Sequence, residues 1–104
     1  MPPPDTQYEE AAVAETREKV EEPPLFKVLL HNDDYTTMEF VVWVLESVFN
    51  MPEEQAIQVM LNVHLRGSGV AGIYTYEVAE TKVEKTSSLA REHEYPLLVT
   101  MEPT

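Results

Sequence analysis

The sequence predicts a domain that contains both helices and strands, in the α/β (α+β) class. We expect a small antiparallel three-stranded sheet with three helices, in the order β-α-α-β-α-β, preceded by a mobile N-terminal tail. Three observations lead to this class. Short apolar runs alternate with longer helical patterns. Capping residues, prolines and glycines separate the two kinds of segment. Finally, 104 residues are enough for one domain and little more.

The first 24 residues differ in composition from the rest of the chain. They hold five prolines, and seven acidic side chains against two basic ones. Tyr8 and Val13 are the only large apolar residues between the first residue and Val20. Such a segment buries too little apolar surface to offset the entropy lost on ordering. We therefore expect residues 1–24 to form an acidic mobile tail, and residues 25–104 to form one compact core domain.

The core domain begins with a predicted strand and an unusually apolar helix. Residues 25–30 form a short apolar run after two prolines, which indicates a buried strand. Thr36 followed by Glu39 fits a capping box, so we expect a helix with Thr36 as N-cap that ends near Phe49. Every residue from 40 to 45 is apolar, which is more than one core-facing stripe requires. Part of this helix should therefore meet a partner, a ligand or water.

The remaining elements follow from proline, glycine and hydrophobic spacing. Pro52 followed by two acidic residues predicts the start of a second helix, with Pro52 as its first residue. Gly67 predicts the end of this helix. Residues 69–76 are rich in β-branched and aromatic side chains and predict a strand. A third helix is expected over 77–92, with its apolar residues along one face, and a closing strand over 95–101. This order suggests a sheet covered on one face by helices.

Charge and composition exclude several classes of function. The formal net charge is −12, so phosphate backbones are repelled and nucleic-acid binding is not expected. The absence of cysteine excludes disulfides, thiol catalysis and cysteine-based zinc sites. There is no signal-like start and no apolar run long enough to span a membrane, so a cytoplasmic protein without membrane contact is expected. A surface this acidic would instead attract cationic groups.

The polar run at residues 32–34, which follows the first strand, is the first candidate site. Asn32, Asp33 and Asp34 have three ordinary explanations: a solvated turn, a metal site or a site for a cationic group. The metal interpretation fits poorly, because no EF-hand register places glycine at the sixth loop position and glutamate at the twelfth. A nucleophile and a glycine-rich loop are also missing, so we expect neither an enzyme nor a bound metal or cofactor.

The second predicted helix offers a surface that complements this run. Spacings of three and four place Met60, Val63 and His64 on adjoining parts of one helix face. Taken alone, a histidine at the end of a helix is more often a capping or solvated residue than a binding residue. Together with residues 32–34, these side chains describe an apolar pocket with acids and an amide at its mouth and a histidine opposite. Such a pocket suits a cationic group attached to a bulky apolar one, as in the N-terminal residue of a polypeptide.

Several segments, taken in order along the chain, resemble the ClpS family of bacterial adaptors that hand proteins to a Clp protease. The resemblance is carried by these segments: FKVLLH at 26–31, NDDYT at 32–36, MEFV at 38–41, MLNVH at 60–64, EVAETK at 77–82 and YPLL at 95–98. It extends to about residue 102. Thr37 departs from the family, which commonly has proline at that position.

The resemblance implies a binding site for the N-terminal residues of substrates. The family positions that hold the substrate's α-amino group match Asn32, Asp33 and His64. Those that line the side-chain pocket match Asp34, Thr36, Met38, Val41, Met60, Val63 and Leu97. The methionine at the position of Met38 is associated with the exclusion of β-branched residues. Substrates beginning with Phe, Tyr, Trp or Leu are therefore expected.

The resemblance also implies a partner. The surface that docks on the N-terminal domain of the ClpA unfoldase includes positions matching Glu77 and Lys82. The expected function is that of a monomeric adaptor, which delivers proteins with destabilising N-terminal residues to ClpA for degradation by ClpAP. The alternative is a domain that docks on a Clp ATPase and blocks or redirects other substrates without reading N-termini. Trp43 lies outside both implied sites, as either a further contact surface or a partly covered aromatic.

Overall fold

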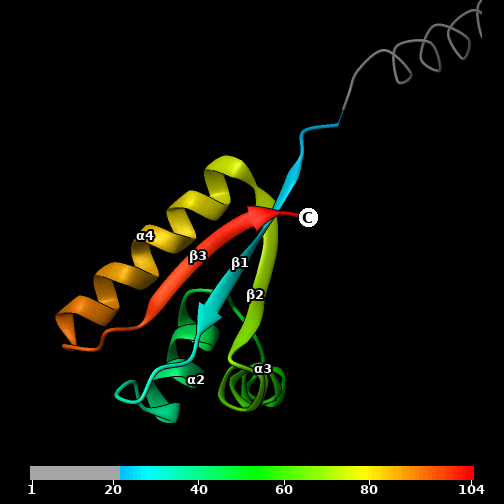
Figure 1. Cartoon of the computed structure of the whole chain (residues 1–104). Coiled ribbons are helices and arrows are strands. Elements are labelled where there is room, and N and C mark those ends of the chain that lie inside the picture. Colours follow the sequence, from blue (N-terminus) through cyan, green and yellow to red (C-terminus); the bar gives the residue numbers. More distant parts are fainter. Residues whose placement is uncertain (1–21) are drawn as a thin grey trace, which may run out of the picture.

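The computed structural model describes residues 22–104 and confirms the predicted fold class. The elements are β1 (Leu25–His31), α2 (Met38–Ser47), α3 (Glu53–Arg66), β2 (Ser68–Thr75), α4 (Tyr76–Glu92) and β3 (Leu98–Pro103) (Figure 1). Most of the predicted mobile tail, 1–24, lies outside the described residues. Its last three residues are exposed and belong to no helix or strand.

The sheet places the first strand in the centre. Its order is β2-β1-β3, and β1 is antiparallel to both neighbours. Val28 and Leu30 of β1 are fully buried, whereas the side chains that alternate with them are only partly covered. This period of two gives the sheet one core face, and the packed helices cover it. A β-bulge at Ala71 on β2, opposite Val28 and Leu29, adds a further buried residue.

Helix α2 supplies much of the core. Phe40, Val41, Val44 and Leu45 are buried, while the Trp43 side chain is 44% exposed. The expectation that part of this apolar helix meets solvent is thus confirmed. The predicted N-cap was wrong by one residue.

The N-cap of α2 is Thr37, whose Oγ1 accepts a hydrogen bond of 3.1 Å from the Phe40 amide. Thr36 cannot serve, because both its amide and its hydroxyl donate to Asp33. With the cap at Thr37, the residue three positions on is Phe40, so Glu39 does not complete a capping box. The helix ends at Ser47, two residues before the predicted Phe49.

Helix α3 begins and ends as its proline and glycine suggest, with a shift of one residue at its start. Pro52 occupies the N-cap position instead of the first helical one. Gly67 ends the helix in the left-handed region, with φ 93°, and its amide donates to the Val63 carbonyl. Strand β2 starts directly afterwards, at Ser68.

Helix α4 and strand β3 complete the domain. The buried residues of α4 are Ala79, Thr86 and Ala90, which fall on the predicted face. The closing strand pairs only from Leu98 onward, later than the predicted residue 95. The preceding turn carries Glu94 with φ 61°, so the chain reverses there before it reaches the sheet. No described helix is long and apolar enough to cross a membrane.

Candidate functional site

The loop between β1 and α2 is organised by the carboxylate of Asp33. Its Oδ1 accepts hydrogen bonds from the amides of Tyr35 and Thr36, at 2.8 and 2.7 Å. Its Oδ2 accepts one from the Thr36 hydroxyl, also at 2.7 Å. The Asn32 amide donates to the Gly67 carbonyl at 2.9 Å, which ties the loop to the end of α3. Asp33 thus shapes the loop in which it lies.

The same contacts keep the Asp33 carboxylate charged. Its partial burial raises its pKa, but the hydrogen bonds from Thr36 and Tyr35 stabilise the charged form more strongly. The net result is a pKa below the usual 3.8. The loop between β1 and α2 therefore carries a negative charge at Asp33, and the hydrogen bonds to the same carboxylate hold the loop in place.

This loop forms one wall of a hollow of about 510 Å³ between α2 and α3. The lining residues are Asn32, Asp33, Asp34, Tyr35, Thr36, Thr37, Met38, Glu39, Val41, Met60, Val63 and His64. Nine of the ten side chains expected to bind an N-terminal residue thus lie around one hollow. Leu97 does not line it: this side chain is buried in the core.

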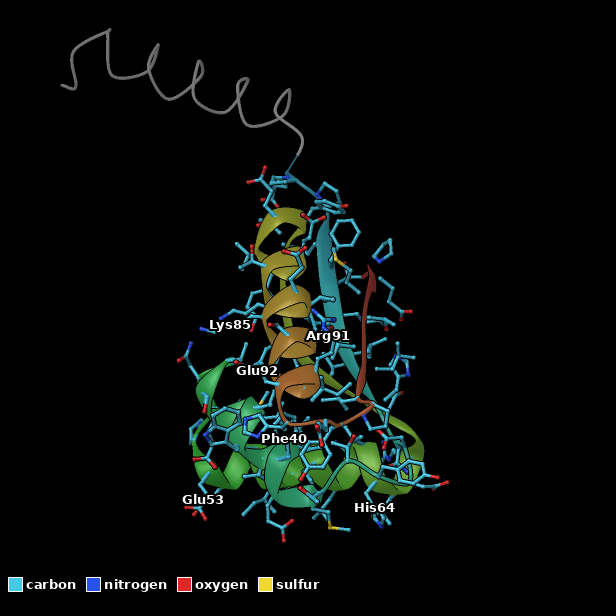
Figure 2. All side chains as sticks on the ribbon, turned by 90° about the vertical axis from the view of Figure 1, so that its left-hand side faces the viewer. Phe40, Glu53, His64, Lys85, Arg91 and Glu92 are labelled. Carbon is cyan, nitrogen blue, oxygen red and sulfur yellow. The ribbon has the colours of Figure 1, made fainter. Side chains whose placement is uncertain are left out.

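The hollow is apolar below and polar at its edge. Val41 and Val63 are buried beneath it, whereas Asn32, Asp34 and His64 are exposed. His64 lies near the C-terminal end of α3, far along the helix from Glu53, and points away from the sheet (Figure 2). This arrangement accommodates a bulky apolar group below a cationic one.

Three residues that line the hollow were not predicted from the sequence. Tyr35, Thr37 and Glu39 reach the hollow because the loop folds around Asp33 and α2 starts immediately after it. Tyr35 is 77% exposed, so it belongs to the edge. The sequence held one signal for them, which is that each lies within two residues of a predicted site residue.

The two residues expected to dock on an unfoldase have different surroundings. Glu77 is exposed in the first turn of α4. The ammonium group of Lys82 donates a hydrogen bond of 2.6 Å to the Val48 carbonyl at the end of α2, and lies about 6 Å from the rings of Phe49 and Tyr74. Lys82 therefore joins α4 to α2, a structural role that the sequence did not reveal.

A protein metal site is not formed by the described part of the chain. Among residues 22–104, no group of three or more histidine and carboxylate side chains is arranged to hold a metal ion.

Comparison with known proteins identifies the family. Residues 21–100 match the family model described as ATP-dependent Clp protease adaptor protein ClpS. An ATP-dependent Clp protease adapter protein ClpS from Desulfatibacillum aliphaticivorans is 59% identical over 91 residues, which are 88% of each chain. One from Myxococcus xanthus is 56% identical over 87 residues, covering 84% of this chain and 81% of that one.

A solved structure shares the fold. It is that of Agrobacterium tumefaciens ClpS2 bound to L-phenylalaninamide, with a TM-score of 0.77 and 43% sequence identity. The match covers 80% of this chain and 100% of that one. Sequence and structure agree with the resemblance of the segments at 32–36 and 77–82, and the chain belongs to the ClpS family of ATP-dependent Clp protease adaptor proteins.

Proposed function

We propose that this adaptor binds the N-terminal residue of its substrates in the hollow between α2 and α3. As a Clp protease adaptor the chain is not an enzyme, so its task is to bind and deliver. The observation that carries the proposal is the hollow itself, with the charged Asp33 and the exposed His64 at its edge and Val41 and Val63 beneath. The bound L-phenylalaninamide of the related ClpS2 is a ligand of this chemistry, with a free amine beside an aromatic side chain.

The binding free energy can be divided between the apolar floor and the polar edge of the hollow. Burial of an aromatic or leucyl side chain contributes about 1.5–3 kcal/mol. Micromolar binding requires about 8 kcal/mol, so contacts to the ammonium group must supply much of the remainder. We assign those contacts to Asn32, Asp33 and His64. The side chain then lies among Asp34, Thr36, Met38, Val41, Met60 and Val63. Leu97 belongs to the hydrophobic core and does not line the hollow.

The partner in this proposal is the N-terminal domain of a ClpA-type unfoldase in the cytoplasm. Glu77 supports this role, because its carboxylate is exposed at the start of α4. Lys82 supports it indirectly, through the contact that fixes α4 against α2. The chain acts as a monomer, with residues 25–104 as the binding domain and residues 1–24 as a tail that takes part in delivery.

The test compares a labelled peptide that begins with Phe with the same peptide acetylated at its N-terminus. We expect the free amine to bind at least tenfold more tightly, because acetylation removes the charge that the edge of the hollow recognises. Fluorescence anisotropy measures both affinities. Equal affinities would favour the alternative, a Clp-docking domain that does not read N-termini.

Asp33→Asn separates the charge of Asp33 from its role in the loop. The amide oxygen still accepts the two backbone hydrogen bonds at Oδ1, the amide nitrogen that replaces Oδ2 can donate to the Thr36 hydroxyl oxygen, and the negative charge is lost. We expect the free-amine peptide to lose at least tenfold in affinity, in line with a charged hydrogen bond. Glu84→Gln, at an exposed position of α4 that does not line the hollow, is the matched control for the change of charge. Unchanged binding by Asp33→Asn would contradict the role of this carboxylate.

A further inference from the structure

A second hollow adjoins the first, and the function proposed above does not use it. Its volume is about 440 Å³, and it is lined by Met38, Glu39, Val42, Trp43, Glu46, Ile57 and Met60. Met38, Glu39 and Met60 line both hollows. The two hollows therefore share a wall made largely of methionine, a flexible side chain that adapts to ligands of different shape. We call the second hollow the α2–α3 groove.

Two helical stripes form the α2–α3 groove. On α2, Met38, Val42 and Glu46 recur every four residues and so lie on one face. On α3, Ile57 and Met60 lie on the stripe that continues to His64. Large apolar side chains stay open to solvent here, with Trp43 44% and Ile57 37% exposed. The groove is thus an uncovered apolar surface that continues from the N-terminal residue's site.

We propose that the α2–α3 groove binds the residues that follow the substrate's N-terminal residue, and that it prefers apolar and basic side chains. This inference rests on the function proposed above and adds a second determinant of substrate choice. Continuity with the first hollow supports it, because a chain whose first residue lies beside Met38 and Met60 can leave over those side chains into the groove.

The length of the groove corresponds to a few substrate residues. The lining residues Met38 and Glu46 lie eight residues apart on α2, which is about 12 Å along the helix axis. An extended peptide advances about 3.3 Å per residue, so this length matches about three to four residues after the first. Figure 2 labels Glu53 and His64 near the two ends of α3, and the groove residues Ile57 and Met60 lie between these two in the helix.

Charge distinguishes between possible occupants. The charged residues that line the groove are the exposed Glu39 and Glu46. They attract basic side chains and repel the acidic first 24 residues of this chain, which hold seven acids against two bases. A net charge of −12 on each copy likewise opposes self-association through this surface. The favoured occupant is therefore a substrate segment that carries apolar or basic residues.

The experiment compares three labelled peptides on the full chain, all beginning with Phe and free of Trp. Residues two to four are Leu-Lys-Leu, Leu-Glu-Leu or Gly-Ser-Gly. We expect Leu-Lys-Leu to bind about fivefold or more tightly than Gly-Ser-Gly, from burial of its apolar side chains. Leu-Glu-Leu should be weaker than Leu-Lys-Leu. Phenylalaninamide is included because it reaches the first hollow alone.

Trp43 provides a direct readout, since it is the only tryptophan in the chain and lines the groove but not the first hollow. Binding of the Leu-Lys-Leu peptide should shift its fluorescence emission. Saturating phenylalaninamide should leave the emission unchanged. This contrast reports where on the protein the additional residues bind.

Two substitutions in the groove test whether its side chains determine the preference among the peptides. Ile57→Ser should reduce the advantage of Leu-Lys-Leu over Gly-Ser-Gly to less than about twofold, because it removes an apolar side chain from the groove. Glu46→Lys should reverse the preference between Lys and Glu at position three. Glu84→Lys, an exposed residue of α4 that does not line the groove, is the control with the same change of charge.

The outcomes separate this inference from the proposed function. Binding of phenylalaninamide with equal affinity for all three peptides would overturn the inference alone. Failure to bind phenylalaninamide or any of the peptides would overturn the proposed function. Competition by a synthetic peptide of residues 1–21 against Leu-Lys-Leu only would assign the groove to that segment instead. A change of oligomeric state in Ile57→Ser would assign it to a second copy.

Discussion

Asp33 combines two tasks in one side chain, since it shapes the loop and supplies charge to the edge of the hollow. The amides of Tyr35 and Thr36 occupy both lone pairs of Oδ1, whereas Oδ2 accepts only the Thr36 hydroxyl and retains acceptor capacity for a ligand. The sequence predicted the charge but not the loop contacts. Those contacts depend on the conformation of residues 33–36, which composition and spacing do not specify.

The lowered pKa of Asp33 predicts a pH dependence of stability. Because the folded pKa lies below the ordinary 3.8, the charged carboxylate stabilises the fold above about pH 4. That contribution is lost as the pH falls through the lower, folded pKa. Asp33→Asn should therefore lose less stability than wild type between pH 6 and pH 2.5, as measured by urea unfolding. Identical profiles for Asp33→Asn and wild type would contradict the assignment.

At the scale of the elements, the close approach of β2 to α3 supports the floor of the hollow. A Cβ on Gly69 would lie 2.8 Å from the Val63 side chain and 3.2 Å from the Val59 carbonyl oxygen. Gly69→Ala should thus force β2 and α3 apart and cost about 1–3 kcal/mol of unfolding free energy. Affinity for a Phe peptide should fall as well, because Val63 moves. Ser68→Ala is the neighbouring control, and an unchanged stability of Gly69→Ala would refute the contact.

Helix α4 carries a polar group that the core does not satisfy. Thr86 is fully buried, and its hydroxyl has no hydrogen-bond partner among residues 22–104. Thr86→Val keeps the shape and removes the unpaired hydroxyl, so it should raise the unfolding free energy by about 1 kcal/mol. Thr81→Val, at an exposed position of the same helix, should not stabilise. A loss of stability in Thr86→Val would show that the hydroxyl is paired in solution.

The helices also show what sequence patterns determine and what they leave open. Hydrophobic spacing, Gly67 and the acids after Pro52 predicted the order of the elements and the end of α3. The N-cap of α2 was wrong because Thr36 and Thr37 are chemically equal candidates, and the choice depends on a side chain outside the helix, that of Asp33. Local motifs therefore locate an element to within a residue or two, and tertiary contacts set its ends.

At the scale of the whole molecule, the two proposed surfaces lie at opposite ends of β1. Leu25, at the start of β1, pairs with Thr75, two residues before Glu77. His31, at its other end, precedes the loop of Asp33. A strand of seven residues is about 20 Å long. Figure 1 shows the same separation, with the start of α4 far from the loop between β1 and α2.

This separation predicts that substrate binding and docking can be lost independently. Glu77→Lys should weaken the complex with a ClpA-type unfoldase about fivefold or more, since it reverses a charge at the proposed interface. The affinity for a free Phe peptide should stay within about twofold of wild type, because the distance exceeds the screening length of roughly 8 Å. Asp33→Asn should show the opposite pattern, and Glu92→Lys, at the other end of α4, is the control for charge. If Glu77→Lys weakened peptide binding as strongly as docking, the two surfaces would have to be coupled through the sheet.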